Sequence, residues 1–372
     1  MKVLHLTSHL DVGGISRYTV SLAAELAQRG HRPIIGADGG ELDAQVRSLG
    51  LPHWRVPLHT SAEFSPQVAL AAWRLATHLE QEPVDLIHAH TRVAQVVAAR
   101  LSRRLHTPYL TTWHGFFRSN LGRRLWPCTG LLTIAISEPV RQHLIRDFGV
   151  PEARIRLIPH GIDAALFASP VEPAVQQRLR EQLQLSEGPV IGTVARLVKS
   201  KGVDQLLRSL PHIRAAAPTA QLLIVGDGEE RAPLEQLAGE LGVASAVRFS
   251  GTLTQTRAAL SLMQVFVFLP AEEEGFGLAL LEAMAAGRPI VAVRRGGGST
   301  WLLDESRVAM AVEPGDVAGL AATVLRSLQD GEEAARASAA HAQALVRDRF
   351  SLSRMVDAVE SVYQEVLRIA SR

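Results

Sequence analysis

Short apolar segments alternate with longer helical patterns along the whole chain, and this order constrains the fold more than any other feature. The apolar segments cover residues 2–7, 32–37, 84–90, 108–113 and 131–137, and then 189–195, 220–226, 247–251, 265–270 and 289–294. The intervening segments have helical spacing, as in 16–30, where Val20, Ala23 and Ala27 share one face and Gly30 marks the end. Strands that alternate with helices predict parallel sheets covered by helices on both faces.

The alternating series begins twice, which indicates two domains. The chain has 372 residues, a length that suits two domains of ordinary size. We predict one Rossmann-like domain over 1–165, a second over 166–350, and a C-terminal helix over 351–372 that packs back on the first. Ligands bind beyond the carboxyl ends of the strands in open α/β sheets. We therefore expect two doubly wound domains that face each other across a cleft holding the site.

The charge distribution is uneven although the formal net charge is only +2. The stretch from Leu86 to Ser137 contains seven arginines and no Asp or Glu. Up to Asp163 there are 18 basic and 13 acidic residues, a charge of +5, which leaves −3 for the remainder. A basic first half predicts an anionic partner such as a nucleotide, a phospholipid or a phosphorylated acceptor. Without a recognised motif and with 5% aromatic residues, nucleic acid is not an expected partner.

Several features bear on the cellular compartment. No apolar run reaches the roughly 18 residues that a membrane span needs. The beginning of the sequence lacks the long apolar stretch of a signal peptide. The single cysteine, Cys128, offers no partner for a disulfide within the chain. We expect a cytoplasmic protein.

The most informative motif is the string EEEGFGLALLEAMAAGRPIVAV over 272–293. It is an acidic loop, a Gly-Phe-Gly turn, a helix and the next strand. Gly275 and Gly277 allow the backbone to approach a ligand closely. The amides of Gly277 and Leu278 lie at a helix N-terminus, where they can donate to a phosphate. Glu282 lies in the second turn, where its carboxylate can accept from vicinal hydroxyls.

This string resembles the signature of the retaining glycosyltransferases of family 4, which have the GT-B fold. The family has two glutamates separated by seven residues, and Glu274 and Glu282 match them. The other matching residues are Gly275, Phe276, Gly277, Ala283, Met284, Ala285, Gly287 and Pro289. The resemblance implies a first domain that binds the acceptor and a second that binds a nucleotide sugar. It implies retaining transfer of a hexosyl unit to an acceptor hydroxyl, with a UDP-sugar as the expected donor and no metal or other cofactor.

A second match is GTVARLVKSKGVD over 192–204. Two cations in a loop between a strand and a helix suit a pyrophosphate. The resemblance implies that Arg196 and Lys201 bind the donor diphosphate and stabilise the leaving nucleoside diphosphate. Lys199 is the alternative to Lys201.

Further matches lie in both halves. Gly14 ends a strand-to-helix turn whose amides would approach the donor, although an ordinary tight turn is the alternative. The resemblance implies that His114 contacts the transferred sugar, and that Glu274 with Phe276, Gly277 and Leu278 binds the donor's hydroxyls and phosphates. Near Leu253 we expect a backbone contact to the base.

Two observations leave questions open. His88 and His90 alternate on one strand and so share a face. They can be structural, contact the acceptor, or bind a metal, for which no third ligand is apparent. Thr300 stands where the family commonly has a glutamate, which leaves one wall of the donor pocket undefined.

The segment over 116–127 bears on the acceptor. Phe117, Leu121 and Leu125 follow one another at steps of four, and Arg118, Arg123 and Arg124 accompany them. If the apolar side chains are exposed, this is a basic amphipathic helix for an anionic membrane. If they are buried, it is a core helix with a solvated basic face. The first case predicts a lipid, lipopolysaccharide or other cell-envelope acceptor at the inner face of the cytoplasmic membrane.

Other classes of protein fit less well. A sugar-nucleotide epimerase with the GT-B fold lacks the EGFG…EAMA string, and a phosphorylase has a much longer chain. A non-catalytic nucleotide-sugar-binding protein is a further alternative. A dinucleotide-dependent dehydrogenase requires a G-x-G-x-x-G fingerprint, which is absent from the N-terminal glycine loop.

Overall fold

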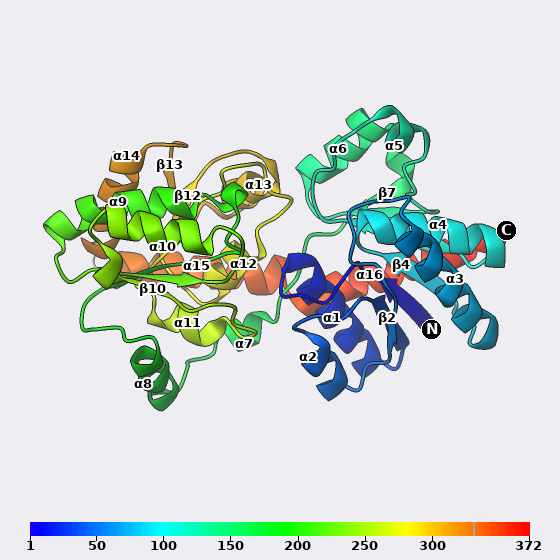
Figure 1. Ribbon diagram of the computed structural model, residues 1–372, viewed down its shortest axis with the longest axis horizontal. Coiled ribbons are helices and arrows are strands. Elements are labelled where there is room, and N and C mark those ends of the chain that lie inside the picture. The colour runs from blue at the N-terminus through cyan, green and yellow to red at the C-terminus, as the bar shows by residue number, and fades with distance from the viewer. Residues whose placement is uncertain (330–331) are drawn as a thin grey trace. The chain divides into compact units, whose positions relative to one another are not determined.

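The computed structural model describes residues 1–329 and 332–372, and it separates into two compact units (Figure 1). Unit 1 comprises residues 1–161 and 352–372, and unit 2 comprises residues 162–351. Each unit has its own parallel sheet with helices on both faces. The α/β class with two Rossmann-like domains, predicted from the alternation of strands and helices, is confirmed.

Unit 1 contains a seven-stranded sheet with the order β3-β2-β1-β4-β5-β6-β7, in which every pair is parallel. Its strands are β1 (Lys2–Leu6), β2 (Arg32–Ala37), β3 (His53–Arg55), β4 (Leu86–Ala89), β5 (Tyr109–Trp113), β6 (Thr133–Ala135) and β7 (Ile155–Leu157). The strand order reverses between β1 and β4. This switch point is where open α/β sheets bind ligands, beyond the carboxyl ends of the strands.

The helices of unit 1 are α1 (Gly14–Gln28), α2 (Asp43–Ser48), α3 (Pro66–Gln81), α4 (Arg92–Leu105), α5 (Leu121–Leu125), α6 (Glu138–Phe148) and α16 (Leu352–Ala370). Side chains at their N-caps fix where several of them begin. Thr91 accepts a hydrogen bond from Ala94 N at the start of α4, and Ser137 accepts one from Val140 N at the start of α6. These caps follow directly on β4 and β6, so the sheet positions the helix starts.

Helix α16 belongs to unit 1 although it is the last element of the chain. In Figure 1 it is drawn in red, against α1. Its buried side chains include Val356, Val359 and Tyr363, which pack against Leu22 and Leu26 of α1. At the end of α1, Arg29 donates to Asp357 and Glu360 of α16. Both apolar packing and ion pairs therefore hold the C-terminal helix on the first sheet.

Unit 2 contains a six-stranded parallel sheet with the order β10-β9-β8-β11-β12-β13. Its strands are β8 (Val190–Val194), β9 (Gln221–Val225), β10 (Val247–Phe249), β11 (Val265–Phe268), β12 (Ile290–Val293) and β13 (Ala309–Val312). Its helices are α7 (Ala164–Ala168), α8 (Pro173–Gln182), α9 (Val203–Ala216), α10 (Arg231–Glu240), α11 (Arg257–Leu262), α12 (Leu278–Ala285), α13 (Gly297–Ser306), α14 (Val317–Gln329) and α15 (Glu332–Arg349). The switch point lies between β8 and β11.

Among the helices of the described residues, none combines the length and the apolar character that crossing a bilayer requires.

Candidate active site

The loops that follow β8 and β11 bring two predicted site residues into contact in unit 2. Lys201 ends a 3₁₀ turn after β8, and Glu274 lies in the acidic loop after β11. The Lys201 Nζ donates to Glu274 Oε1. Both side chains are largely shielded, with 28% and 14% of their surface exposed. A cation and a carboxylate are therefore paired at the switch point of the second sheet.

Gly202 explains why these two loops approach so closely. Its φ is +61°, in the left-handed region that favours glycine. A Cβ at this position would lie 2.4 Å from the carbonyl oxygen of Leu269, the residue that follows β11. Only glycine fits, and this close contact holds Lys201 beside the end of β11.

Glu282 is fixed from one side by a hydroxyl. It lies in α12, is only 6% exposed, and its Oε2 accepts a hydrogen bond of 2.7 Å from Thr256 Oγ1. A buried carboxylate that holds one hydroxyl has further lone pairs with which to accept from other donors. Glu274 and Glu282 thus lie at the start and in the middle of one loop-to-helix segment, and each is oriented by a partner.

The Gly-Phe-Gly turn offers backbone groups to a ligand and turns its side chain inward. Phe276 is buried and lies 5.9 Å from the ring of Phe350 and 6.3 Å from the ring of Trp301. Gly277 has a φ of +99° and is the N-cap of α12, which has no side-chain cap. The first amides of α12, from Leu278 onward, therefore meet no capping side chain.

Arg196 and Leu253, two further predicted donor residues of unit 2, each follow a strand of the second sheet. Arg196 follows β8 and is exposed, and within the described part of the chain its guanidinium makes no ion pair. Leu253 follows β10 and is half-buried. Thr300 accepts a hydrogen bond from Gly296 N with its hydroxyl. That hydroxyl therefore closes the loop before α13.

In unit 1, histidines gather at the carboxyl ends of several strands. His5 is in β1, His88 is in β4, His90 and His114 directly follow β4 and β5, and His160 follows β7. The register pairs His5 with His88 on adjacent strands. Burial lowers the pKa of all five rings, to about 3 for His5 and His160. The cluster is therefore neutral at physiological pH.

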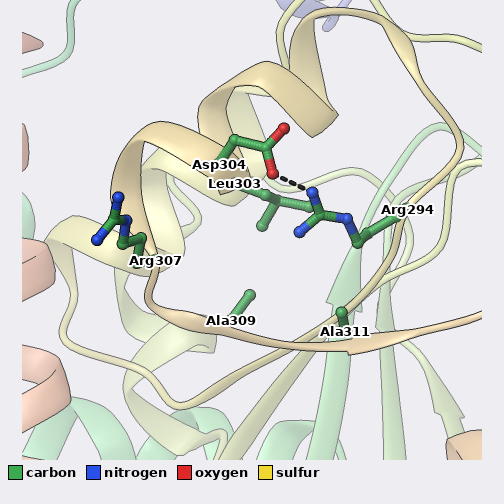
Figure 2. Close-up of a pocket in the computed structure, with 6 residues that line it drawn as sticks. All are labelled: Arg294, Leu303, Asp304, Arg307, Ala309 and Ala311. Atoms are coloured by element: carbon green, nitrogen blue, oxygen red, sulfur yellow. Dashed lines mark hydrogen bonds and ion pairs between the residues drawn. The ribbon is translucent and has the colours of Figure 1, made fainter.

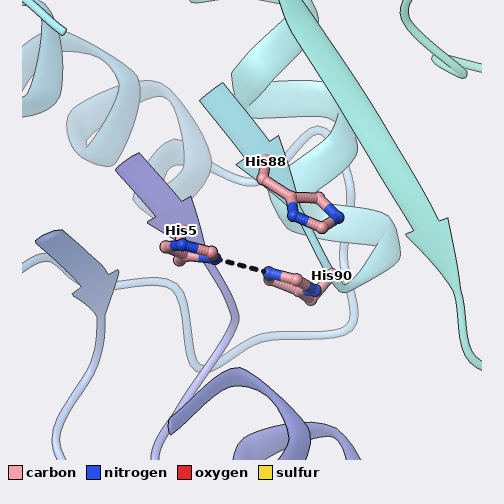
Figure 3. A group of neighbouring side chains, drawn as sticks. All are labelled: His5, His88 and His90. Carbon is pink, nitrogen blue, oxygen red and sulfur yellow. Dashed lines mark hydrogen bonds between the residues drawn. The ribbon is translucent and has the colours of Figure 1, made fainter. Parts of the chain in front are cut away.

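Two groups of side chains bring potential metal ligands together. His5, His88 and His90 place one nitrogen each within 4.8 Å of one another (Figure 3). However, His88 uses both nitrogens in hydrogen bonds of 2.7 Å, to Tyr363 and Thr112. His9, Asp11 and His59 form a second, more exposed group, in which the two rings lie against each other at 4.6 Å. The two rings are tilted by 31°, and His9 Nδ1 and His59 Nε2 lie 3.2 Å and 3.8 Å from Asp11 Oδ2.

Sequence patterns pointed to His88, His90 and His114 but not to His5 or His160. His5 stands in the middle of the first apolar segment, so it looked like a strand residue and nothing more. The signal for its role was the parallel arrangement of the first and fourth strands, which puts position 5 beside position 88. His160 lies in the stretch that was assigned to the linker.

Gly14 is the first residue of α1, and it is exposed. The preceding Gly13 has an extended backbone with a φ of −175°, which any residue can adopt. Helix α1 has no side-chain cap. Its first amides can therefore meet an anion at the carboxyl end of β1.

The segment over 116–127 contains only a short helix, α5, which has five residues. Leu121 and Leu125 are 73% and 77% exposed, and Arg118 and Arg124 are exposed as well. Phe117 is half-buried, 4.8 Å from the ring of Trp113. Of the residues predicted to form a basic amphipathic helix over 116–127, some are therefore exposed and others pack against unit 1.

Arg123 is one of the residues in 116–127 that pack against unit 1. Its guanidinium pairs with Glu63, which is 9% exposed and which also accepts from Arg92. An arginine that shares a buried carboxylate in this way fixes α5 to the segment before α3.

A separate cavity of about 440 Å³ lies at the edge strand β13, between β12, α13 and β13 (Figure 2). Arg294, Asp304 and Arg307 line it, together with Leu303, Ala309 and Ala311. Arg294 donates to Asp304 across its mouth. None of these residues belongs to the predicted site. The ion pair with Asp304 provides a partner for Arg294, one of the two arginines that line the cavity.

Comparison with known proteins agrees with this arrangement. Residues 12–166 match the family described as Glycosyltransferase Family 4, and residues 175–343 match Glycosyl transferases group 1. A GDP-mannose-dependent alpha-(1-6)-phosphatidylinositol monomannoside mannosyltransferase of Mycolicibacterium smegmatis is 34% identical over 345 residues, 87% of each chain. An N-acetyl-alpha-D-glucosaminyl L-malate synthase of Bacillus anthracis is 25% identical and covers 98% of this chain and 97% of its own.

Solved structures show the same fold. A glycosyltransferase from Rickettsia africae has a TM-score of 0.85 at 22% identity, over 98% of both chains. Anabaena HepE in complex with UDP and glucose has a TM-score of 0.84 at 23% identity, over 98% of this chain and 99% of its own. The resemblance drawn from the glutamate motif is thereby confirmed. The chain has the GT-B fold of two Rossmann-like domains and belongs to glycosyltransferase family 4.

Proposed function

We propose that this glycosyltransferase moves a hexosyl unit from a nucleoside diphosphate sugar to an acceptor hydroxyl with retention of the anomeric configuration. The observation that carries the proposal is the pairing of Lys201 with Glu274 beside the buried Glu282, at the switch point of the second sheet. A cation there suits the diphosphate, and two fixed carboxylates suit hydroxyls of the ribose and the sugar.

In the proposed mechanism, Arg196 and Lys201 bind the diphosphate, and Glu282 accepts from the ribose hydroxyls. Glu274 and the amides near Gly277 hold hydroxyls of the transferred sugar, and His114 orients that sugar. The bond between the anomeric carbon and the phosphate oxygen breaks, and the bond to the acceptor oxygen forms on the same face. The acceptor proton passes to the departing phosphate. The cations stabilise charge that grows on the leaving group, so they act more strongly in the transition state than in the ground state.

Relatives support a nucleotide sugar as donor but name different bases. The mannosyltransferase of M. smegmatis is named as GDP-mannose-dependent, whereas Anabaena HepE was solved with UDP. The proposal is therefore for a nucleoside diphosphate hexose, with GDP and UDP as the two bases to compare. A ligand at about 100 times its dissociation constant stabilises the folded state by roughly 2.7 kcal/mol, which a thermal-shift assay detects.

We further propose that the acceptor is lipid-linked and is reached at an anionic membrane surface. The support is a cluster that we call the α5 patch, formed by the exposed side chains of Phe64, Leu121 and Leu125. The Phe64 ring lies 6.3 Å from the ring of Trp126, directly after α5, and the Arg100 guanidinium lies 6.0 Å from the centroid of the Phe64 ring. Exposed apolar side chains surrounded by arginines suit a surface that is both apolar and negatively charged.

The deciding experiment measures release of free UDP or GDP from the matching hexose donor, with and without acceptor. A transferase releases the nucleotide when an acceptor hydroxyl is present, and proton NMR of the product shows whether the anomeric configuration is retained. Nucleotide release that is independent of every acceptor, or an inverted product, would contradict the proposal. Soluble acceptors such as L-malate or inositol phosphate, set beside a phosphoinositide, test the acceptor class.

A further inference from the structure

Four of the clustered histidines form one continuous chain of ring-to-ring hydrogen bonds within unit 1. His160 Nε2 lies 3.0 Å from His114 Nδ1, and His114 Nε2 lies 3.4 Å from His90 Nδ1. His90 Nε2 lies 3.2 Å from His5 Nδ1. Each of the two inner rings, His114 and His90, therefore uses both of its nitrogens toward other histidines.

The strand register produces this chain. His5 lies in β1. His90 directly follows the adjacent strand β4, and His114 directly follows the next strand, β5. His5 and His90 are fully buried, and their rings stack at 5.5 Å with only 7° between their planes. His160 is 3% exposed. His114 is the least buried ring of the four, so it is the one that a ligand can reach.

A neutral imidazole carries one N–H and one lone pair, so each ring in such a chain donates on one side and accepts on the other. One proton position therefore fixes all the others. The chain ends at His5 Nε2, a buried atom with no hydrogen-bond partner among the described residues. The other end is His160 Nδ1, which is also buried. The donors can run from His5 to His160 or from His160 to His5, and in each direction the four tautomers are set together.

We infer that His5, His90 and His160 are positioning residues that hold the His114 ring in one orientation and in a single tautomer. If His5 donates to His90, then His90 donates from Nδ1 to His114 Nε2 and His114 donates from Nδ1 to His160 Nε2. In the opposite direction each donor becomes the acceptor, and His114 carries its proton on Nε2. The proton on His114 thus depends on His5, a residue two rings away. His88 lies beside the chain and is not a member, because Tyr363 and Thr112 occupy its two nitrogens.

A bound metal ion explains the cluster less well than this chain. A metal among His5, His88 and His90 would need a lone pair from His88 and one from His90, and hydrogen bonds already use both nitrogens of each of these rings. None of the three residues is a carboxylate that would compensate a buried divalent charge. The hydrogen-bonded chain instead accounts for every ring nitrogen of His90 and His114.

The inference rests on the proposed function only where it assigns a role to the orientation of His114. The tautomer itself is measured by long-range ¹H–¹⁵N correlation spectra of the full chain with ¹⁵N-labelled histidine at pH 7.5. Nδ1–H and Nε2–H rings give distinct nitrogen shifts. We expect a single tautomer for His114, either Nδ1–H or Nε2–H, and, in the His5→Leu variant, a mixture of the two. His5→Asn supplies both a donor and an acceptor near the position of Nδ1 and is expected to restore the single tautomer.

His78→Gln is the matched control, since His78 is exposed on α3 and stacks on Trp54 outside the chain. It is expected to leave the His114 signals unchanged. A mixture of tautomers at His114 in the wild type, or a single tautomer that survives His5→Leu, would overturn the inference. Glycosyl transfer is measured on the same variants, and a loss of kcat at unchanged KM is expected for His5→Leu. If His5→Leu loses the single tautomer of His114 but keeps full kcat, the result would support the hydrogen-bonded chain and contradict the proposed role of His114 in transfer.

Discussion

Lys201 donates to Glu274, and this contact joins the loop after β8 to the loop after β11. The two residues are 73 positions apart in the sequence. They meet because β8 and β11 are neighbours in the sheet and because Gly202 lets the first loop approach Leu269. The pair therefore couples a proposed diphosphate ligand to a proposed sugar ligand.

Replacing Lys201 with Ala is expected to reduce kcat by about 10²–10³-fold, the usual effect of removing one group that stabilises transition-state charge. It also leaves the shielded Glu274 without its cation. The measurement is steady-state kinetics with the nucleotide sugar. Lys199→Ala is the control, because the Lys199 side chain is 88% exposed. An equal loss in both variants would assign the effect to loop charge rather than to Lys201.

Removal of the carboxylate at Glu282 is expected to weaken nucleoside diphosphate binding. A hydrogen bond to a charged group contributes about 1.5–3 kcal/mol, so Glu282→Ala should raise the dissociation constant of the nucleotide at least about tenfold. Thr256→Val, which removes only the hydroxyl that orients Glu282, should have a smaller effect. Calorimetric titration measures both. Glu272→Gln, in the exposed part of the same acidic loop, should bind the nucleotide normally, and a comparable loss there would argue against a specific role for Glu282.

The turn at Gly277 is expected to tolerate no side chain. Its φ of +99° is unfavourable for L-residues, and a Cβ would lie 3.2 Å from the ring of Phe268. Gly277→Ala should therefore lower the free energy of unfolding by about 1–2 kcal/mol or more. Gly239 lies within α10 and has open space around its Cβ position, so Gly239→Ala should stabilise by roughly 0.5–1 kcal/mol. Thermal denaturation measures the stability of both variants against the wild type. Stabilisation by Gly277→Ala would show that the turn is not constrained as described.

Acid is expected to destabilise unit 1 through its histidines. Burial lowers the pKa of His5 and His160 to about 3 and that of His88, His90 and His114 well below the usual value. The unfolded chain therefore binds protons that the folded chain does not. The contribution of these histidines to the free energy of unfolding is complete above the unfolded pKa of about 6.5. It falls as the pH decreases from there toward about 3.

Each such proton contributes a slope of about 1.4 kcal/mol per pH unit in the free energy of unfolding. Urea denaturation at pH 7, 6 and 5 measures this slope. His5→Leu should reduce it by close to one proton, whereas His78→Gln, outside the cluster, should leave it unchanged. A stability that does not vary between pH 7 and pH 5 would mean that the five rings are accessible to protons in the folded state.

Binding to anionic membranes is expected to depend on the α5 patch. Vesicles that contain phosphatidylglycerol should sediment the wild-type protein at low salt and less of it at high salt, because salt screens the arginines. The double variant Leu121→Ser and Leu125→Ser should lose roughly tenfold or more in affinity, since both exposed apolar side chains are removed. Leu166 is an exposed leucine in unit 2, and Leu166→Ser is the control. Unchanged sedimentation of the double variant would contradict the membrane proposal.

Local patterns in the sequence were sufficient for the class of fold and for the family. The period of the apolar residues predicted strands and helices, because a buried strand and an amphipathic helix each impose their own spacing. Glu274 and Glu282 belong to one loop-to-helix segment of the fold, so a short string contains both. Gly277, between the two glutamates, has a φ of +99°, a backbone angle that favours glycine.

The tertiary structure alone decided which distant side chains meet. The chain from His160 to His5 depends on the neighbouring positions of β1, β4 and β5, which no local pattern specifies. Arg123 pairs with Glu63 rather than with solvent, and Thr300 closes a backbone turn. In each case the partner lies on another element or in a turn whose shape the spacing does not encode. Strand order and register arise from the packing of the whole sheet, so these contacts exist only once the domain has folded.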